Sequence, residues 1–395
     1  PDTSREQLML TVKEMRARLA SNPDDAPALV QLAGALLRLQ RVNQDERSGQ
    51  AALEHLEAFL SRHHDNYDAR RLLAATLTSQ HRFGDGIAEA NALIARDPRD
   101  AWNYGILGDA YLELGDYDRA FAAFDRMGAL QPGPPAYGRV AYALELKGDL
   151  AGALEYMLRA ADGTTPNDAE SQAWHYSQVG MLRLQTGKLA QAAREFERAL
   201  ATFPTYPLAV EGMARVRVAA GEFTAARKLY REQFARTPAA HLAAAVADLS
   251  AAIGDSGEAA RYDEMAEQIE RATWAVGQRQ PQGLARLLAE RNRDLPTALT
   301  LSEEAARRQR DIGTMDTLAW TYFKAGRFDD AAKASAEALR TGSRDARLLY
   351  HAAEIRNAMG ERDAARELIS RLPTRQIADV LLGRAITRLE QSLLQ

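Results

Sequence analysis

The segment Tyr104–Pro132 reads YGILGDAYLELGDYDRAFAAFDRMGALQP and contains two apolar stripes separated by a Gly-Asp pair. Apolar residues at three- and four-residue spacing predict an amphipathic helix on each side of that pair. Gly115 can adopt the left-handed backbone that ends a helix, and Asp116 can cap the helix that follows. Small residues at Gly108 and Ala120 allow the two helix axes to approach closely. The stretch therefore predicts one antiparallel helical hairpin.

The same pattern recurs along the chain. With Ala120 as the marker, equivalent alanines stand at Ala153, Ala192, Ala226, Ala259, Ala298, Ala331 and Ala365, at spacings of 33, 39, 34, 33, 39, 33 and 34 residues. The glycine that breaks each hairpin recurs at Gly115, Gly148, Gly187, Gly221, Gly254, Gly326 and Gly360. The unit that ends in Ala298 carries Asp294 at this place. Weaker copies lie upstream, one of them with an insertion at about residues 41–50. Each hairpin leaves one face apolar and must stack on a neighbour.

These units resemble the tetratricopeptide repeat, whose period is 34 residues. The best-matching unit has Leu107, Gly108, Tyr111, Ala120, Phe124 and Pro132 at the motif positions. The resemblance covers nearly the whole chain. It implies an all-α fold, a right-handed superhelical solenoid of antiparallel helix pairs with about ten hairpin units. A last helix at about residues 375–394 is expected to cap the stack, and a helix at about residues 4–20 to precede it.

The domain organisation allows two interpretations. The helix through MAEQIERATWAVGQRQPQG is overlong and breaks at Pro281 and Gly283. This break favours an N-terminal array of about seven units over residues 1–275 and C-terminal units with the capping helix over residues 276–395. The alternative is one continuous, slightly irregular solenoid. A polar insertion, DGTTPNDAESQA, accounts for the other long spacing.

The composition and the absence of known motifs argue against most classes of catalytic, cofactor and metal site. The 395 residues carry a formal net charge of −4, which gives no basic field for nucleic acid. There are no cysteines, so disulfides, thiolate catalysis and iron–sulfur clusters are excluded. No phosphate loop or dinucleotide fingerprint is present, and no apolar run is long enough to span a membrane. The seven histidines are scattered, and the adjacent pair at residues 63 and 64 has no third metal ligand. We therefore expect no enzyme activity, no cofactor and no metal.

A stacked array of helix pairs presents a continuous surface on which a partner can bind. The resemblance implies that fixed positions in the first helix of each unit line a concave inner face. These positions hold Trp102, Asp109, Tyr142, Glu145, Trp174, Met181, Leu184, Trp320, Phe323, Lys324, Tyr350 and Glu354. Aromatic side chains carry much of the binding energy at protein interfaces. The alternative interpretation is that these rings pack between units as core. The Lys and Asn set with which one subtype clamps a peptide carboxylate is absent.

The sequence thus favours a non-enzymatic scaffold that binds an unidentified protein or peptide in a groove. A structural self-assembler is a second hypothesis, and an enzyme with a site hidden in the groove is a third. Only His241 among the histidines falls in the inner-face register, which argues against the third. The C-terminal part looks like bacterial multi-repeat proteins, several of which are exported or lipid-anchored, and this resemblance favours the cell envelope or periplasm over the cytoplasm. The oligomeric state stays open.

Overall fold

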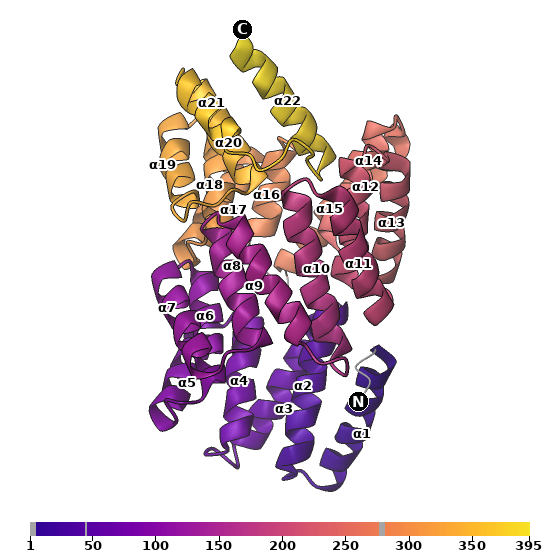
Figure 1. The fold of residues 1–395 in the computed structure, drawn as a ribbon, viewed down its shortest axis with the longest axis vertical. Helices are drawn as coiled ribbons and strands as arrows, with labels where there is room; N and C mark the ends of the chain where they lie inside the picture. The colour runs from indigo at the N-terminus through magenta and orange to yellow at the C-terminus, as the bar shows by residue number, and fades with distance from the viewer. Residues whose placement is uncertain (1–4, 44–45, 276–280) are drawn as a thin grey trace. The chain divides into compact units, whose positions relative to one another are not determined.

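A computed structural model describes residues 5–43, 46–275 and 281–395. These residues form 22 α-helices and no strand (Figure 1). The helices are α1 (Arg5–Ser21), α2 (Ala26–Asn43), α3 (Glu46–Leu60), α4 (Tyr67–Ser79), α5 (Phe83–Arg96), α6 (Ala101–Leu114), α7 (Tyr117–Leu130), α8 (Pro134–Leu146), α9 (Leu150–Gly163), α10 (Ala169–Gln185), α11 (Leu189–Thr202), α12 (Pro207–Ala219), α13 (Phe223–Arg236), α14 (Ala240–Ala252), α15 (Ser256–Ala275), α16 (Gln282–Glu290), α17 (Leu295–Arg308), α18 (Ile312–Lys324), α19 (Phe328–Ala338), α20 (Ala346–Ala358), α21 (Arg362–Ser370) and α22 (Val380–Leu394). They make an all-α helical-repeat solenoid, as predicted.

The helices of the described residues form ten hairpin pairs, from α2–α3 to α20–α21, with α1 before them and α22 after them. In the pair α6–α7, the Asp100 carboxylate accepts a hydrogen bond from the Trp102 amide and so caps the start of α6. Gly115 ends that helix in the left-handed region with φ of 80°. The Asp116 amide then donates to the Tyr111 carbonyl at 2.9 Å, and its side chain caps α7. The turn at Gly115 and the cap at Asp116, both predicted from the sequence, are confirmed.

Close helix contact within a pair depends on the small residues. A Cβ atom on Gly108 would lie 2.4 Å from Cε1 of Phe124, far inside van der Waals contact. The next-but-one pair repeats this arrangement, because a Cβ on Gly180 would lie 2.6 Å from Cε1 of Phe196. Phe124 and Phe196 are both buried. A larger side chain at either glycine would therefore force the two helices apart.

The break position has a left-handed backbone in each of the seven units in which the sequence places a glycine there. All seven predicted glycines have positive φ, between 73° and 88°. In the pair α16–α17 the residue that ends the first helix is Asn292, with φ of 52°, and a second left-handed residue follows at Asp294, with φ of 41°. Its carboxylate accepts a hydrogen bond from the Thr297 amide at 3.4 Å, which offsets part of the strain of a non-glycine residue there. The turn that lacked a glycine in the sequence is thus formed by Asn292, whose amide donates to the Ala289 carbonyl as the Gly115 amide donates to that of Leu112, while Asp294 caps the next helix.

Tertiary contacts divide the chain into two compact units. The first contains the described parts of residues 1–142 with 155–176 and 198–207. Within it, Arg41 on α2 reaches Glu170 on α10, 129 residues away, with 2.7 Å between Nη2 and Oε2. The second unit contains residues 143–154 and 177–197 with the described parts of 208–395. Within it, the turn at Gly148 packs on the turn at Gly342, where a Cβ on Gly148 would lie 2.5 Å from the Gly342 carbonyl oxygen.

Several boundaries differ in detail from the expectations. The first described helix runs from residue 5, and α22 begins at Val380, five residues later than expected. The insertion near residues 41–50 lengthens α2 and α3, while residues 44–45 lie outside the described residues. The predicted domain boundary falls where α15 ends at Ala275, and residues 276–280 also lie outside the described residues. That boundary stays a prediction.

Candidate partner-binding surface

The predicted inner-face residues lie on α6, α8, α10, α18 and α20, the first helix of five pairs. Their exposure divides them into three groups. Trp102 and Tyr142 are exposed, at 38% and 44%. Asp109, Glu145, Trp174, Met181, Phe323, Lys324 and Glu354 are half-buried. Leu184, Trp320 and Tyr350 are buried. Exposed aromatic rings are therefore confined, within this set, to the first two of the five helices.

The Trp102 ring is held in place by charged and polar neighbours on α4. The Arg71 guanidinium carbon lies 5.5 Å from the centroid of the indole, in cation–π range. Arg71 Nε is 2.9 Å from Oδ2 of Asp100, and the Tyr67 hydroxyl donates to the same oxygen at 2.9 Å. This network fixes the ring from one side and leaves part of it open to solvent.

An ion pair joins α6 to α8 between the two exposed rings. Arg139 donates two hydrogen bonds to Asp109, with Nε–Oδ1 of 2.8 Å and Nη2–Oδ2 of 2.6 Å. Trp102 lies seven residues before Asp109, and Tyr142 lies three residues after Arg139. At a rise of about 1.5 Å per residue, the two rings stand about 15 Å apart along the helix axes. The surface therefore presents two apolar anchors with a fixed ion pair between them.

The middle residues of the set serve mainly as packing. The Trp174 ring lies against the backbone of α8, since a Cβ on Gly138 would be 3.3 Å from its Cζ3 atom. Burial raises the pKa of Glu145, and its Oε1 atom accepts a hydrogen bond from Gln185 at 2.5 Å. Leu184 is 3% exposed. For these side chains the geometry agrees with the alternative interpretation, in which they pack between neighbouring helices.

The aromatic residues of α18 and α20 form a stacked cluster. The Trp320 ring stacks on His351 at 4.0 Å between centroids and on Phe323 at 4.9 Å. The Lys324 ammonium lies 4.8 Å from the Trp320 ring. The Tyr350 hydroxyl donates to Glu354 at 3.0 Å, and burial beside that carboxylate raises the pKa of Tyr350. Trp320, Tyr350 and His351 are buried in this cluster, and α22 packs against Trp320 and Tyr350.

Sequence reasoning missed the cations that organise this surface, Arg71 and Arg139. Each pairs with an acidic residue in an adjacent unit, 29 and 30 residues away. The pair of Glu211 and His241, 3.3 Å apart, has the same separation of 30 residues. Opposite charges about one repeat apart on the first helices were thus the signal that could have revealed these contacts.

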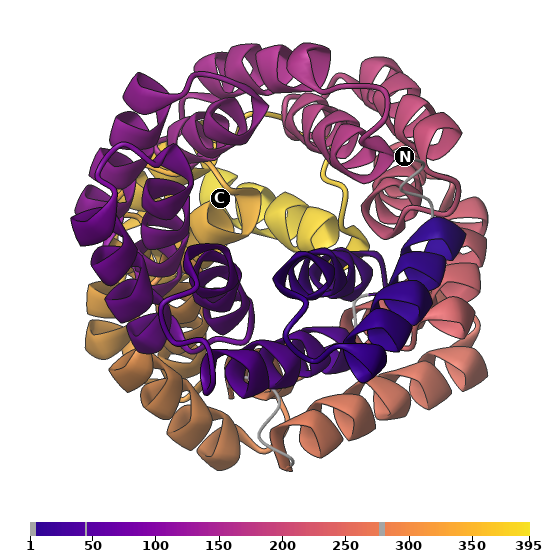
Figure 2. The same cartoon turned by 90° about the horizontal axis from the view of Figure 1, so that it is seen from below.

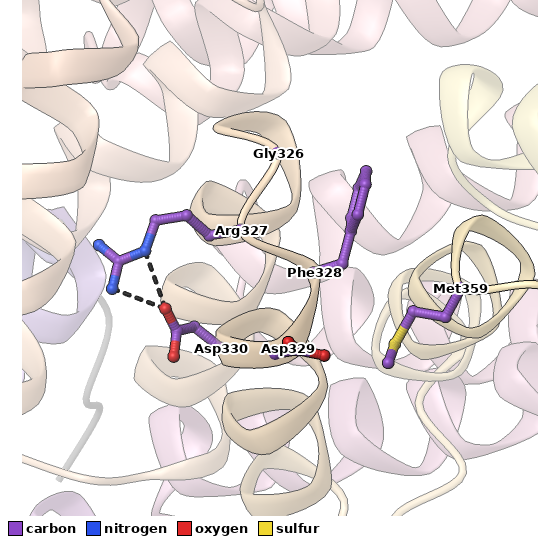
Figure 3. A pocket seen from close by; sticks show the side chains of 6 residues that line it. All are labelled: Gly326, Arg327, Phe328, Asp329, Asp330 and Met359. Atoms are coloured by element: carbon purple, nitrogen blue, oxygen red, sulfur yellow. Dashed lines mark hydrogen bonds and ion pairs between the residues drawn. The ribbon is translucent and has the colours of Figure 1, made fainter.

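A shallow pocket adjoins one end of the predicted set, where the Phe328 ring contacts Phe323. Figure 3 shows its lining, which comes from the turn between α18 and α19 and the end of α20: Gly326, Arg327, Phe328, Asp329, Asp330 and Met359. Arg327 is neutralised within the pocket, because its Nη2 atom lies 2.7 Å from Oδ2 of Asp330. The pocket thus offers one exposed ring, Phe328, and no unpaired arginine for a ligand.

The histidines do not assemble a site in the part of the chain that the structure describes. His63 pairs with Asp24 at 2.8 Å, and His64 contacts Asp65 at 3.2 Å on the surface. Across the described ranges no group of three His, Asp or Glu side chains could hold a metal ion. None of the described helices combines the length and apolarity that crossing a membrane requires.

Stacked helix pairs with small residues at the crossings and a left-handed break in each pair define a helical-repeat protein. Sequence profiles of the tetratricopeptide repeat family match residues 183–249 with one profile and residues 76–135, 107–169 and 317–379 with another. These matches together cover more than half of the chain. The chain therefore belongs to the tetratricopeptide repeat family as a multi-repeat member, and its repeats are those of protein–protein interaction scaffolds. No curated protein sequence matches it.

Several solved structures share the fold at low identity. The human IFIT1 dimer with m7Gppp-AAAA is 14% identical, with 84% of this chain and 76% of that chain covered and a TM-score of 0.54. The monomeric IFIT1 mutant with Gppp-AAAA is 12% identical, with coverage of 93% and 86% and a TM-score of 0.50. PilW, a type IV pilus biogenesis factor, is 18% identical, with coverage of 51% and 92% and a TM-score of 0.45. Likeness at these identities establishes the fold alone.

Proposed function

We propose that this protein is a non-enzymatic scaffold that binds a peptide or partner helix on the inner face of α6 and α8. The observation that supports this proposal is the exposure of Trp102 and Tyr142, the only two aromatic rings of the predicted set that remain open among the described residues. Exposed aromatic anchors in a polar surround are typical of protein-binding surfaces.

The spacing of the anchors defines the ligand. Two apolar side chains offset by about 15 Å along the helix axes correspond, in that direction, to about three turns of helix or about five residues of extended chain. The Asp109–Arg139 pair between the anchors is already neutralised, so the middle of the ligand is expected to carry uncharged polar residues. A charged residue there would be desolvated without a free partner.

A peptide library displayed on phage and selected on the full chain tests this proposal. Selected peptides are then titrated against the double variant Trp102→Ala/Tyr142→Ala. We expect the dissociation constants to rise at least about thirtyfold, because truncating one aromatic anchor typically costs about 2 kcal/mol.

The matched control is Trp274→Ala on α15. Trp274 is 43% exposed, as open as the two anchors, and lies outside the inner-face register. The Trp274→Ala variant should bind every selected peptide with a dissociation constant within about twofold of the wild-type value, because an ordinary surface substitution has only a small effect. Selected peptides that bind the double variant as tightly as the wild type would refute the proposal, and so would a library that yields no binder.

A further inference from the structure

The last helix, α22, does not continue the hairpin pattern of the repeats. Nine residues, 371–379, separate it from α21 and form no regular helix. Its apolar side packs within the second unit, where Ile386, Leu389 and Leu393 join one buried cluster with Trp320 and Tyr350. Figure 1 shows α22 beside α20 and α21, and Figure 2 shows the same helix, in yellow, from below. The helix α22, joined to α21 by nine residues, therefore covers the inner-face aromatic residues Trp320 and Tyr350.

The surface beneath α22 contains two arginines that bind the C-terminal end of this helix. Arg366 on α21 donates from Nη2 to the Leu393 carbonyl oxygen at 2.6 Å, and Arg362 donates to the Ser392 carbonyl oxygen at 2.6 Å. The last carbonyls of any α-helix lack partners within that helix, and cations near them are favourable. These two arginines thus recognise main-chain atoms, which another helix of different sequence would present equally well.

The surface also contains a donor that α22 leaves unused. The Trp320 side chain is 7% exposed, and its Nε1–H has no acceptor among the described residues. Buried indole N–H groups normally find a partner, because leaving one unpaired costs about 1–3 kcal/mol. A helix identical to α22 would leave the same donor unpaired, so a second copy of this chain is not the best occupant.

We propose that the α18–α21 surface, defined by Trp320, Leu349, Tyr350, Ile369, Arg362 and Arg366, is a second binding site. Its occupant is an amphipathic helix of a partner protein, and α22 fills the site in the free chain. The partner helix has the apolar spacing of Ile386, Leu389 and Leu393 and adds a hydrogen-bond acceptor for the Trp320 indole. This site is separate from the α6–α8 surface and does not rest on the function proposed for it.

Exchange with a peptide in trans tests the site on the full chain. The probe is a fluorescent peptide of residues 379–395, and the variant is Leu389→Asp, which places a charge in the apolar cluster and releases α22. We expect the variant to bind the probe at least about tenfold more tightly than the wild type. In the wild type the tethered helix competes at an effective concentration of about a millimolar.

The matched control is Leu394→Asp on the same helix. Leu394 is 85% exposed and lies on the outer side of α22, whereas Leu389 is 2% exposed. The control should bind the probe as weakly as the wild type does. Equal binding by all three proteins, with the variant folded by circular dichroism, would overturn the proposal. A concentration-dependent dimer lost in Leu389→Asp would assign the surface to exchange between copies and contradict a foreign partner.

A second experiment remains informative if Leu389→Asp fails to fold. A protease site inserted after Ala378 in the otherwise native chain allows the tether to be cut. We expect the cut helix to leave on dilution and the labelled probe to take its place. A cut helix that stays bound and never exchanges would show that α22 is a permanent part of the core.

The acceptor is tested by nuclear magnetic resonance of the four tryptophan indoles, with Trp320→Phe to assign the signal. Three probe peptides, which carry Gln singly at position 386, 389 or 393, are added at saturating concentration to the Leu389→Asp variant, in which the site is open. At least one should move the Trp320 indole proton downfield relative to the parent peptide, because a new hydrogen bond deshields it. No change with any of the three would refute the acceptor.

Discussion

Phe196→Ala is expected to lower the free energy of unfolding by about 3–5 kcal/mol, the usual cost of truncating a buried phenylalanine. The ring is fully buried on α11 and is held between two glycines. A Cβ would lie 2.6 Å from its Cε1 atom if added to Gly180 on α10, and 2.2 Å if added to Gly212 on α12. Three helices converge on this ring, so they cannot collapse into the space that its removal leaves. Urea unfolding of the full chain, followed by circular dichroism, measures the loss.

A double substitution separates packing from other effects. Gly212→Ala should be destabilising in the wild type, where the new methyl group meets the Phe196 ring. In the Phe196→Ala background the same methyl group partly fills the cavity, and alanine favours the helix by about 1 kcal/mol over glycine. The substitution should therefore turn neutral or stabilising there. Phe328→Ala, at an aromatic residue that is 40% exposed, is the control and should cost under about 1 kcal/mol. A loss at Phe196 no larger than this control would contradict the packing argument.

The contact between Gly180 and Phe196 illustrates what the repeat pattern could predict. The repeat motif has a small residue on the first helix and an aromatic residue on the second, and the structure brings the two together. The repeat also predicted the left-handed turns at its seven break glycines, whereas the left-handed turn of the unit without a glycine was not predicted. These features are local, and each recurs with the period of the repeat. The pattern therefore determined the fold through most of the chain.

The candidate site was less predictable, because exposure depends on residues outside the repeat. Trp102 and Trp320 were both assigned to the inner face from their positions on the first helix of a pair. Trp102 is 38% exposed, whereas Trp320 is 7% exposed in a cluster that includes residues of α22. No periodicity in the repeats specifies where a terminal helix on a nine-residue tether packs. Whether an inner-face ring is exposed or covered therefore depends on tertiary packing that the repeat pattern does not specify.

Acidification from pH 7 to pH 4 should stabilise the folded chain through Asp248. This carboxyl group is on α14, and Arg291 lies 2.7 Å away. Burial, together with Asp379 and Glu290, outweighs that cation and raises the pKa of Asp248 from 3.8 to about 7. The folded state thus holds a proton that the unfolded state releases above pH 4. The contribution of this proton to the free energy of unfolding is present below pH 4 and is lost as the pH rises through 7. The difference between the two pKa values of Asp248 corresponds to about 4 kcal/mol in the free energy of unfolding.

The variant Asp248→Asn removes this titration while keeping an oxygen acceptor for Arg291. Its free energy of unfolding, relative to the wild type, should rise by up to about 4 kcal/mol between pH 4 and pH 8. His175 provides a comparison of opposite sign, since burial lowers the pKa of His175 from 6.5 to about 4. Its contribution is present above pH 6.5 and is lost on acidification, so His175→Gln should gain relative stability as the pH falls. Parallel slopes in the two variants would contradict both assignments, because one buried acid and one buried base must respond to protons in opposite directions.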